Sequence, residues 1–342
     1  MRYLSVFSGI EAATLAWRPI GWTSAGVSEI DPYACRVLEY RFPELTNYGD
    51  AKKFQEWEIP AGSIDVLVGG PPCQSWSGAG LRRGFKDERG RLVMVFLEMV
   101  EMFRPTWFAF ENVPDIVSTD GGRALGHLLG QITDLGYGWA YRCLDASGWG
   151  VPQRRKRFFL IGHSSGDFRY SAHVLFESKR MHWDSEPMFK ESVHPTGTTT
   201  DSPGTTVEKG FCWDGLNTSR ALTRTISQFR LMPDKYNFNA VLQRTGNMDE
   251  SPLVARHYTP LECERLMGFP DNFTNICWYK CCGVEYTGRL GDRSCSICNG
   301  LKQPKLVQMK DKRRYQLIGN SIVVPQLRWI GERIQLVSEK MN

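Results

Sequence analysis

The sequence predicts an α/β fold with a smaller, loop-rich second domain. Short apolar runs alternate with helical patterns over the first 163 residues, which is typical of a doubly wound parallel sheet. Residues 164–255 hold few long helical patterns and include the turn-rich stretch PTGTTTDSPGTT (195–206). The chain has 342 residues, enough for one large domain and a smaller companion.

Each expected strand is a short apolar run that ends near a glycine or a polar residue. These runs are YLSVF (3–7), SAGVSE (24–29), DVLVGG (65–70), TWFAFEN (106–112), YRCLDAS (141–147) and RFFLIGH (157–163). The expected helices carry apolar residues at helical spacing, and they lie near 10–18, 32–41, 91–103, 123–135, 259–268 and 321–337. In a sheet of this class, ligands bind beyond the carboxyl ends of the strands, so those ends are where we look for function.

Composition limits the function classes. No apolar stretch is long enough to span a membrane, and the start, MRYLSVFSGIEAA, lacks the apolar core of a secretory signal. We therefore expect a soluble, cytoplasmic protein. Lys and Arg number 42 against 37 Asp and Glu, a small excess. The basic clusters at 82–83, 154–157 and 310–314 suit a polyanion, or equally form solvated faces.

The first strand runs into FSGIEAA (7–13), which opens a helix. Gly9 permits a tight turn there, and a helix N-terminus offers free N–H groups to a ligand. Glu29 ends the second strand, where a carboxylate commonly accepts hydrogen bonds from ribose hydroxyls, and Asp50 could serve an adenine edge. Because the glycines that bind a pyrophosphate are absent, a nucleoside cofactor fits better than a dinucleotide, which argues against a dehydrogenase. A generic strand–helix turn is the alternative.

A cysteine follows two prolines in GGPPCQSW (69–76). Cys73 comes just after the strand 65–70, at the edge of the sheet where ligands bind. Pro71 and Pro72 fix the backbone, and a rigid loop holds a nucleophile at a set distance. A lone cysteine is more often buried and inert, but this context favours a nucleophilic thiol.

Two further groups are expected beside this thiol. Glu111 ends the strand 106–112, and a carboxylic acid there can protonate a ring nitrogen while the sulfur of Cys73 adds to an electron-poor ring. Residues 153–157, QRRKR, precede the strand 157–163. Arginine in that position can bind a carbonyl oxygen or a phosphate and lower the thiol pKa, although a surface basic patch is the alternative.

Together these blocks resemble the DNA (cytosine-5) methyltransferases. The matching blocks, in the order found in that family, are FSGIEAA, Glu29, GGPPCQSWS, ENV, QRRKR, TPLECERLMGFPD and GNS. The resemblance implies a Rossmann-like S-adenosylmethionine-dependent methyltransferase sheet and a smaller target-recognition domain. It also implies double-stranded DNA as the partner and a flipped-out cytosine as the target.

Roles follow from the resemblance position by position. Cys73 would attack C6 of the cytosine, Glu111 would contact N3 and the amine, and Arg155 and Arg157 would hold the base. C5 then takes the methyl group of S-adenosylmethionine. The implied cofactor contacts are Phe7, Gly9, Ile10, Glu11, Glu29, Ile30, Asp50, Pro72, Asn320 and Ser321.

The expected domains are 1–163 with 315–342 for catalysis, 164–274 for target recognition and 275–314 for a Cys-rich insert. Candidate DNA contacts in the second domain are Arg220, Arg224, Arg230 and Arg244. We expect a monomer in a bacterial cell or a phage-infected host. An RNA cytosine-5 methyltransferase and a catalytically silent DNA-binding homologue are the alternative functions.

Five of the ten cysteines fall within 22 residues of the insert, a cluster that favours a structural zinc over a disulfide framework in a cytosolic protein. Cys295 and Cys298 have the two-residue spacing of a zinc knuckle. Cys277 with Cys281 or Cys282 would supply the other pair. Unrelated surface thiols are the alternative.

Overall fold

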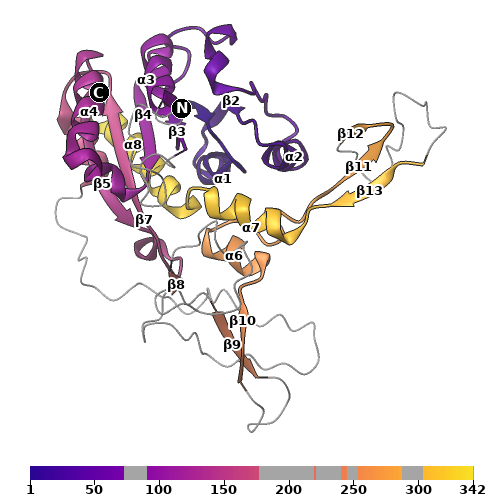
Figure 1. The fold of residues 1–342 in the computed structure, drawn as a ribbon. Helices are drawn as coiled ribbons and strands as arrows, with labels where there is room; N and C mark the ends of the chain where they lie inside the picture. Colours follow the sequence, from indigo (N-terminus) through magenta and orange to yellow (C-terminus); the bar gives the residue numbers. More distant parts are fainter. Residues whose placement is uncertain (73–90, 177–218, 221–239, 245–252, 287–302, 342) are drawn as a thin grey trace.

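A six-stranded sheet forms the centre of the computed structural model, which describes residues 1–72, 91–176, 219–220, 240–244, 253–286 and 303–341 (Figure 1). Its strands are β1 (Arg2–Val6), β2 (Thr23–Ser28), β3 (Val66–Gly69), β4 (Trp107–Asn112), β5 (Gly138–Asp145) and β7 (Lys156–His163). They lie in the order β2-β1-β3-β4-β7-β5. Each corresponds to a run predicted from the sequence.

One strand differs from the all-parallel prediction. β7 is antiparallel to both β4 and β5, whereas β1 to β4 pair in parallel. The reason is the connection from β5 to β7, which spans residues 146–155 and carries only the 3-10 helix η6 (Ala146–Trp149) and the short strand β6 (Gln153–Arg154). A parallel crossover needs a dozen or more residues, usually in a helix, so this short link returns the chain in the opposite direction.

Helices cover both faces of the sheet. They are α1 (Ala12–Trp17), α2 (Pro32–Arg41), α3 (Arg91–Phe103), α4 (Arg123–Asp134), α5 (Phe168–Leu175), α6 (Pro260–Leu266), α7 (Asp311–Asn320) and α8 (Val324–Met341). Successive residues of a strand point to opposite faces, so Tyr3 joins the core under α1, α5 and α8, while Leu4 joins the core under α3 and α4. The result is a three-layer α/β domain (Figure 1).

Smaller elements connect these layers. The remaining 3-10 helices are η1 (Arg18–Ile20), η2 (Ala51–Glu56), η4 (Pro114–Val117) and η5 (Thr119–Gly122). The remaining strands are β8 (Ser219–Arg220), β9 (Ala240–Arg244), β10 (Leu253–His257), β11 (Cys277–Cys281), β12 (Val284–Tyr286) and β13 (Lys305–Gln308).

Both ends of the expected target-recognition segment, 164–274, pack against the central sheet and its helices. α5 lies on β5, where the Ser171 hydroxyl donates to the Gly138 carbonyl at 2.9 Å. At the other end, the buried residues Tyr258, Leu266 and Phe273 belong to the same hydrophobic core as the sheet. α5 packs on α8 and α6 packs on α7, so both segments lie against the three-layer domain.

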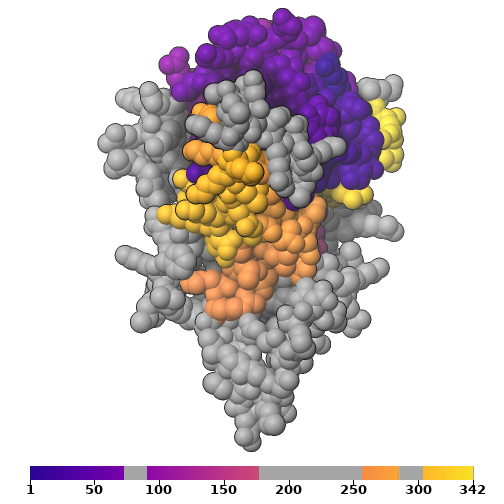
Figure 2. Space-filling view, turned by 90° about the vertical axis from the view of Figure 1, so that its right-hand side faces the viewer, coloured from indigo at the N-terminus to yellow at the C-terminus, as the bar shows by residue number. Residues whose placement is uncertain are grey.

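The Cys-rich insert forms an arm. β12, β11 and β13 make a three-stranded antiparallel sheet that extends away from the main body (Figure 1). Its root rests on α2, where the ring of Trp278 meets Tyr33 edge-on and the Arg313 guanidinium lies 4.6 Å from the centroid of the Tyr33 ring. Figure 2 views this side, with the arm's yellow and orange atoms below the indigo N-terminal part.

Candidate active site

The turn after β1 is held in shape by a carboxylate from β2. Phe7 and Gly9 both have positive φ angles, 52° and 57°. Glu29 accepts the Gly9 amide at 2.7 Å through one oxygen, and its other oxygen accepts the amides of Ile30 and Asp31 at 2.8 and 2.7 Å. Glu29 thus ties the glycine turn to the end of β2. A Cβ on Gly9 would meet no atom within 4 Å, so space for a ligand lies open above the turn.

A pocket opens at this edge of the sheet. Its walls are the carboxyl ends of β1 and β3, the start of α1, the acid on β4 and the loop after α7. The lining residues are Ser5, Val6, Phe7, Ser8, Gly9, Ala12, Ala13, Val68, Gly69, Gly70, Glu111, Asn320, Ser321, Ile322 and Leu327. Four predicted cofactor residues, Phe7, Gly9, Asn320 and Ser321, therefore meet at one place with the predicted acid.

The other predicted cofactor residues lie around this pocket in different ways. Ile30 is 67% exposed beside Glu29, an apolar surface on which a planar ring could rest. Ile10 is completely buried in the core. Asp50 caps η2 by accepting the Lys52 amide at 3.0 Å, and Pro72 is exposed at the end of the described loop.

Glu11 lies beneath the pocket instead of lining it. Its carboxylate caps α1 by accepting the amide and hydroxyl of Thr14, both at 2.9 Å. The residue is fully buried and has a left-handed φ of 64°, which few side chains adopt. Burial raises the pKa of this carboxyl to about 7, and hydrogen bonds from Ser5 and Thr14 offset only part of that effect.

The predicted acid is positioned by a glycine and an arginine. A Cβ on Gly70 would lie 2.8 Å from Oε2 of Glu111, so a larger residue there would displace the carboxyl from this position. Nε of Arg157 lies 3.2 Å from Oε1 of Glu111. Burial raises the pKa of Glu111, while Arg157 and then Arg155 oppose that rise. A raised pKa keeps a carboxyl available as a proton donor near neutral pH.

Cys73 itself lies outside the described residues. The loop leading to it is anchored, because the Asn112 side chain donates to the Pro71 carbonyl at 3.4 Å. The thiol loop therefore leaves the sheet beside Glu111.

Alternate residues of QRRKR serve three different neighbours. The Gln153 amide donates to the Leu266 carbonyl at the end of α6, at 3.0 Å. The Arg155 guanidinium donates to the Gly319 and Ser321 carbonyls at 3.0 and 2.9 Å. Arg157 pairs with Glu111 through Nε. Nη2 of Arg155 thus contacts the backbone beside Asn320, and the base-holding role of Arg155 stays a prediction.

The arm changes the expected metal-ligand pairing. In the extended strand β11, Cys277 and Cys281 are separated by about 13 Å, whereas two thiolates on one tetrahedral zinc lie about 3.8 Å apart. Cys277 cannot share a metal with Cys281, which corrects that pairing. The sulfurs of Cys281 and Cys282, by contrast, are 3.7 Å apart. Cys295 and Cys298 lie outside the described residues.

Among the side chains that the structure describes, no group of three or more His, Cys, Asp or Glu could hold a metal ion.

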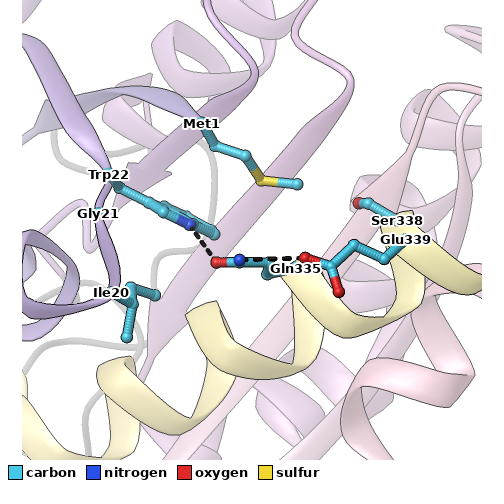
Figure 3. Close-up of a pocket in the computed structure, with 7 residues that line it drawn as sticks. All are labelled: Met1, Ile20, Gly21, Trp22, Gln335, Ser338 and Glu339. Carbon is cyan, nitrogen blue, oxygen red and sulfur yellow. Dashed lines mark hydrogen bonds between the residues drawn. The ribbon is translucent and has the colours of Figure 1, made fainter.

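A larger hollow, of about 400 Å³, lies at the opposite end of the sheet (Figure 3). Met1 and Trp22, at the amino ends of β1 and β2, face Gln335 and Glu339 of α8 across it. The Trp22 indole donates to the Gln335 side chain at 3.0 Å, which in turn donates to Glu339 at 3.1 Å. Ligands of open α/β sheets bind at the carboxyl ends, so the smaller pocket is the candidate site.

A sequence model of the C-5 cytosine-specific DNA methylases matches residues 1–277, more than three quarters of the chain. The chain belongs to this family. The match covers the glycine turn, Glu29, the prolines before Cys73, Glu111 and the QRRKR strand. Cytosine-5 methylases of this family use S-adenosylmethionine as the methyl donor.

Several DNA methyltransferases are similar to this chain. DNA N-6-adenine-methyltransferase of Escherichia phage P1 is 28% identical over 467 aligned residues, covering 97% of this chain and 61% of that protein. Type II methyltransferase M2.BsuMI of Bacillus subtilis (strain 168) is 29% identical, covering 98% of this chain and 75% of that protein. The chain thus spans less than two thirds of the phage relative.

Solved structures agree on the fold. The Entamoeba histolytica methyltransferase EhMeth superposes with a TM-score of 0.60 at 16% identity, covering 98% of this chain and 97% of that one. A putative DNA modification methyltransferase from an E. coli prophage gives a TM-score of 0.57 at 18% identity, covering 99% of this chain and all of the other. At these identities the likeness extends to the methyltransferase fold alone.

Among the described residues, no helix combines the length and apolar character needed to cross a membrane.

Sequence reasoning missed some residues of the site. Asn112 holds the Pro71 carbonyl, and its signal was present because it follows Glu111 directly in ENV. Ile322 and Leu327 line the pocket from the start of the last helical segment, and nothing in their apolar pattern separated them from ordinary core residues.

Proposed function

We propose that this chain is a DNA (cytosine-5) methyltransferase that transfers the methyl group of S-adenosylmethionine to C5 of a flipped-out cytosine. The observation that carries the proposal is Glu111. This largely buried acid with a raised pKa lies against Gly70, three residues before Cys73, and lines the pocket at the carboxyl ends of the strands. Family membership supports the same reaction.

In the proposed reaction the protein's own groups share the work. The Cys73 thiolate adds to C6 of cytosine, and Glu111 donates a hydrogen bond or a proton to N3, which makes C5 electron-rich. Arg157 holds the Glu111 carboxyl in place. S-adenosylmethionine supplies the methyl group that C5 takes up. Loss of the C5 proton and of the cysteine then releases 5-methylcytosine.

The cofactor would lie along the glycine turn. Glu29 stands at the place where it can face ribose hydroxyls, and Ile30 offers an exposed apolar surface to the adenine. Asn320 and Ser321 face the pocket from the opposite side.

A test with one variant separates chemistry from folding. We expect Cys73→Ser to abolish transfer of tritiated methyl groups to duplex DNA while S-adenosylmethionine binding stays within about twofold of wild type. Wild-type protein should also form a covalent complex with duplex DNA that contains 5-fluorocytosine. Failure of that trap would favour a catalytically silent DNA-binding homologue.

The substrate is the second element of the proposal. Two other substrates have to be distinguished from cytosine in DNA. One relative is named for adenine N6 methylation. The alternative function given above is cytosine-5 methylation of RNA. An acid beside a nucleophilic thiol suits attack on a ring carbon, whereas methylation of an exocyclic amine needs no such thiol. Tritium should enter cytosine of duplex DNA, and label in adenine or in transfer RNA would refute the assignment.

The wider setting is also proposed. We infer that the protein acts as a monomer on double-stranded DNA in the cytoplasm of a bacterial or phage-infected cell, since similar proteins come from bacteria and phages. Bisulfite sequencing of DNA from cells that express the chain would report both activity and target context. Sedimentation of the purified protein would give its oligomeric state.

We further propose a structural zinc in the arm, with Cys281 and Cys282 as one pair of ligands. Their sulfur separation of 3.7 Å matches two thiolates on one tetrahedral ion, about 3.8 Å. Cys282 also has a positive φ of 52° in the two-residue turn between β11 and β12, where Asn or Gly is usual. Metal analysis should find one zinc per chain and none in Cys281→Ser/Cys282→Ser, with Cys277→Ser as the control that keeps it.

A further inference from the structure

We propose that Arg155 is a positioning residue for the cofactor side of the pocket, acting through Asn320, and does not hold the target base. The inference rests on the proposed function, because it assigns a role in binding S-adenosylmethionine. It separates two arginines of the QRRKR strand, Arg155 and Arg157, that the sequence treats alike.

The contacts of Arg155 enclose one residue of the pocket wall. Its Nη2 donates to the Gly319 carbonyl at 3.0 Å and to the Ser321 carbonyl at 2.9 Å. These two carbonyls flank Asn320, whose side chain is exposed and lines the pocket. One buried cation, 2% exposed, thus fixes the backbone on both sides of Asn320.

Arg155 also provides a hydrogen-bond donor for the carbonyls at the C-terminal end of α7. α7 ends at Asn320, and the last carbonyls of a helix have no partner within it. The partial negative charge at a helix C-terminus attracts a cation. Arg155 meets both needs from the link between β6 and β7, 164 residues distant in sequence from Gly319. Without it, two carbonyls at the end of α7 lose a buried charged donor.

The backbone of Arg155 is itself fixed. Its amide donates to the Asp145 carboxylate at 3.1 Å, and its carbonyl accepts the Ala146 amide at 3.0 Å. The guanidinium therefore projects from a rigid segment, as a positioning group requires. Asp145 lies at the end of β5, so the central sheet fixes the backbone of Arg155. Through the Arg155 side chain, the sheet also fixes residues 319–321.

Arg157 makes the contrast. Its Nε lies 3.2 Å from Glu111, and 18% of its side chain remains exposed, so it faces the reacting end of the site. Arg155 lies between β6 and β7, whereas Arg157 lies within β7, so the two side chains reach different neighbours. We expect substitutions at Arg157 to affect catalysis and those at Arg155 to affect cofactor affinity.

The test measures two affinities separately. Calorimetry gives the Kd for S-adenosylmethionine without DNA, and a fluorescent duplex gives the Kd for DNA without cofactor. A lysine at position 155 can reach one carbonyl instead of two, so Arg155→Lys should weaken S-adenosylmethionine binding about tenfold and leave DNA affinity within about twofold. Arg155→Gln, which lacks the charge, should weaken cofactor binding further.

Arg314 is the matched control, because it is another buried arginine whose hydrogen bonds hold α7. Arg314, also buried on α7, donates to Thr274 at 3.1 Å and to Glu264 at 3.3 Å, far from the pocket end. Arg314→Lys should lower the melting temperature without weakening cofactor binding more than about twofold. An equal loss in Arg314→Lys and Arg155→Lys would show that α7 stability alone is responsible and would overturn the inference.

A double-mutant cycle tests the route through Asn320. Asn320→Ala should weaken cofactor binding, and adding Arg155→Lys in that background should cost less than about twofold more. Effects that multiply would overturn the inference, as would Arg155→Lys weakening DNA binding alone. If the wild-type protein binds no S-adenosylmethionine, the proposed function fails first and this inference falls with it.

Discussion

Glu11 makes the stability of this protein depend on pH in a way that one substitution should remove. The carboxyl is fully buried under the glycine turn, and its pKa rises from the ordinary 4.5 to about 7 on folding. A folded-state pKa above the unfolded value means that the folded protein binds the proton more tightly. This contribution to stability is complete below pH 4.5 and is lost as the pH rises to 7.

The size of the loss follows from the two pKa values. Folding with a charged Glu11 costs about 3 kcal/mol more than folding with a neutral one, and about 2.5 kcal/mol of that falls between pH 5 and pH 8. Glu11→Gln removes the titrating group, while its side-chain oxygen can still accept from Thr14. We therefore expect the pH dependence of the variant to be shallower by about that amount.

Urea unfolding at pH 5, 6, 7 and 8 measures the difference. Comparing slopes against pH, instead of absolute stabilities, cancels any packing cost of the new amide. Glu98→Gln on the exposed face of α3 is the control for losing one carboxylate, and its slope should match that of wild type. Parallel curves for Glu11→Gln and wild type would refute a buried, neutralised Glu11.

Three further predictions concern the scaffold. A Cβ on Gly331 would lie 2.4 Å from Nε1 of Trp17, so Gly331→Ala should destabilise the protein by about 1–3 kcal/mol. Gly130→Ala should instead stabilise the protein by about 0.5–1 kcal/mol, because Gly130 is exposed on a helix and its Cβ would meet no atom within 4 Å. The urea midpoints of the two alanine variants show whether the contact with Trp17 or helix propensity determines the effect at position 331. Thr259 and Glu262 form a capping box at the start of α6, so Thr259→Ala should cost about 1 kcal/mol, and an unchanged melting temperature would contradict it.

Much of the central fold could be predicted because its signals are local. All six central strands were found from short apolar runs, and α3 matches its predicted bounds of 91–103. The antiparallel direction of β7 was missed, although the short link 146–155 carried the evidence. α7, in contrast, has the charged sequence DKRRYQLIGN, and its helix is stabilised by packing against α6, a contact no local pattern reveals.

The candidate site, like the fold, could be predicted from the sequence only in part. Motif order placed Glu111, Gly9 and Asn320 around one pocket, because strand ends and helix starts meet at one edge of the sheet. The role of Arg155 could not be read in advance, since its acceptors are carbonyls of residues 319 and 321, which every residue type has. The arm's cysteines were noticed by spacing, but only the extended geometry of β11 separates Cys277 from Cys281.

The pocket has walls from two segments far apart in sequence, and the Trp17 indole donates to the Leu327 carbonyl across 310 positions. The glycine turn is therefore translated long before the opposite wall of the pocket. A nascent chain that lacks α8 has no complete pocket, and an apolar flank of α1 stays uncovered until α8 leaves the ribosome. The pocket can therefore form only after α8 has been translated.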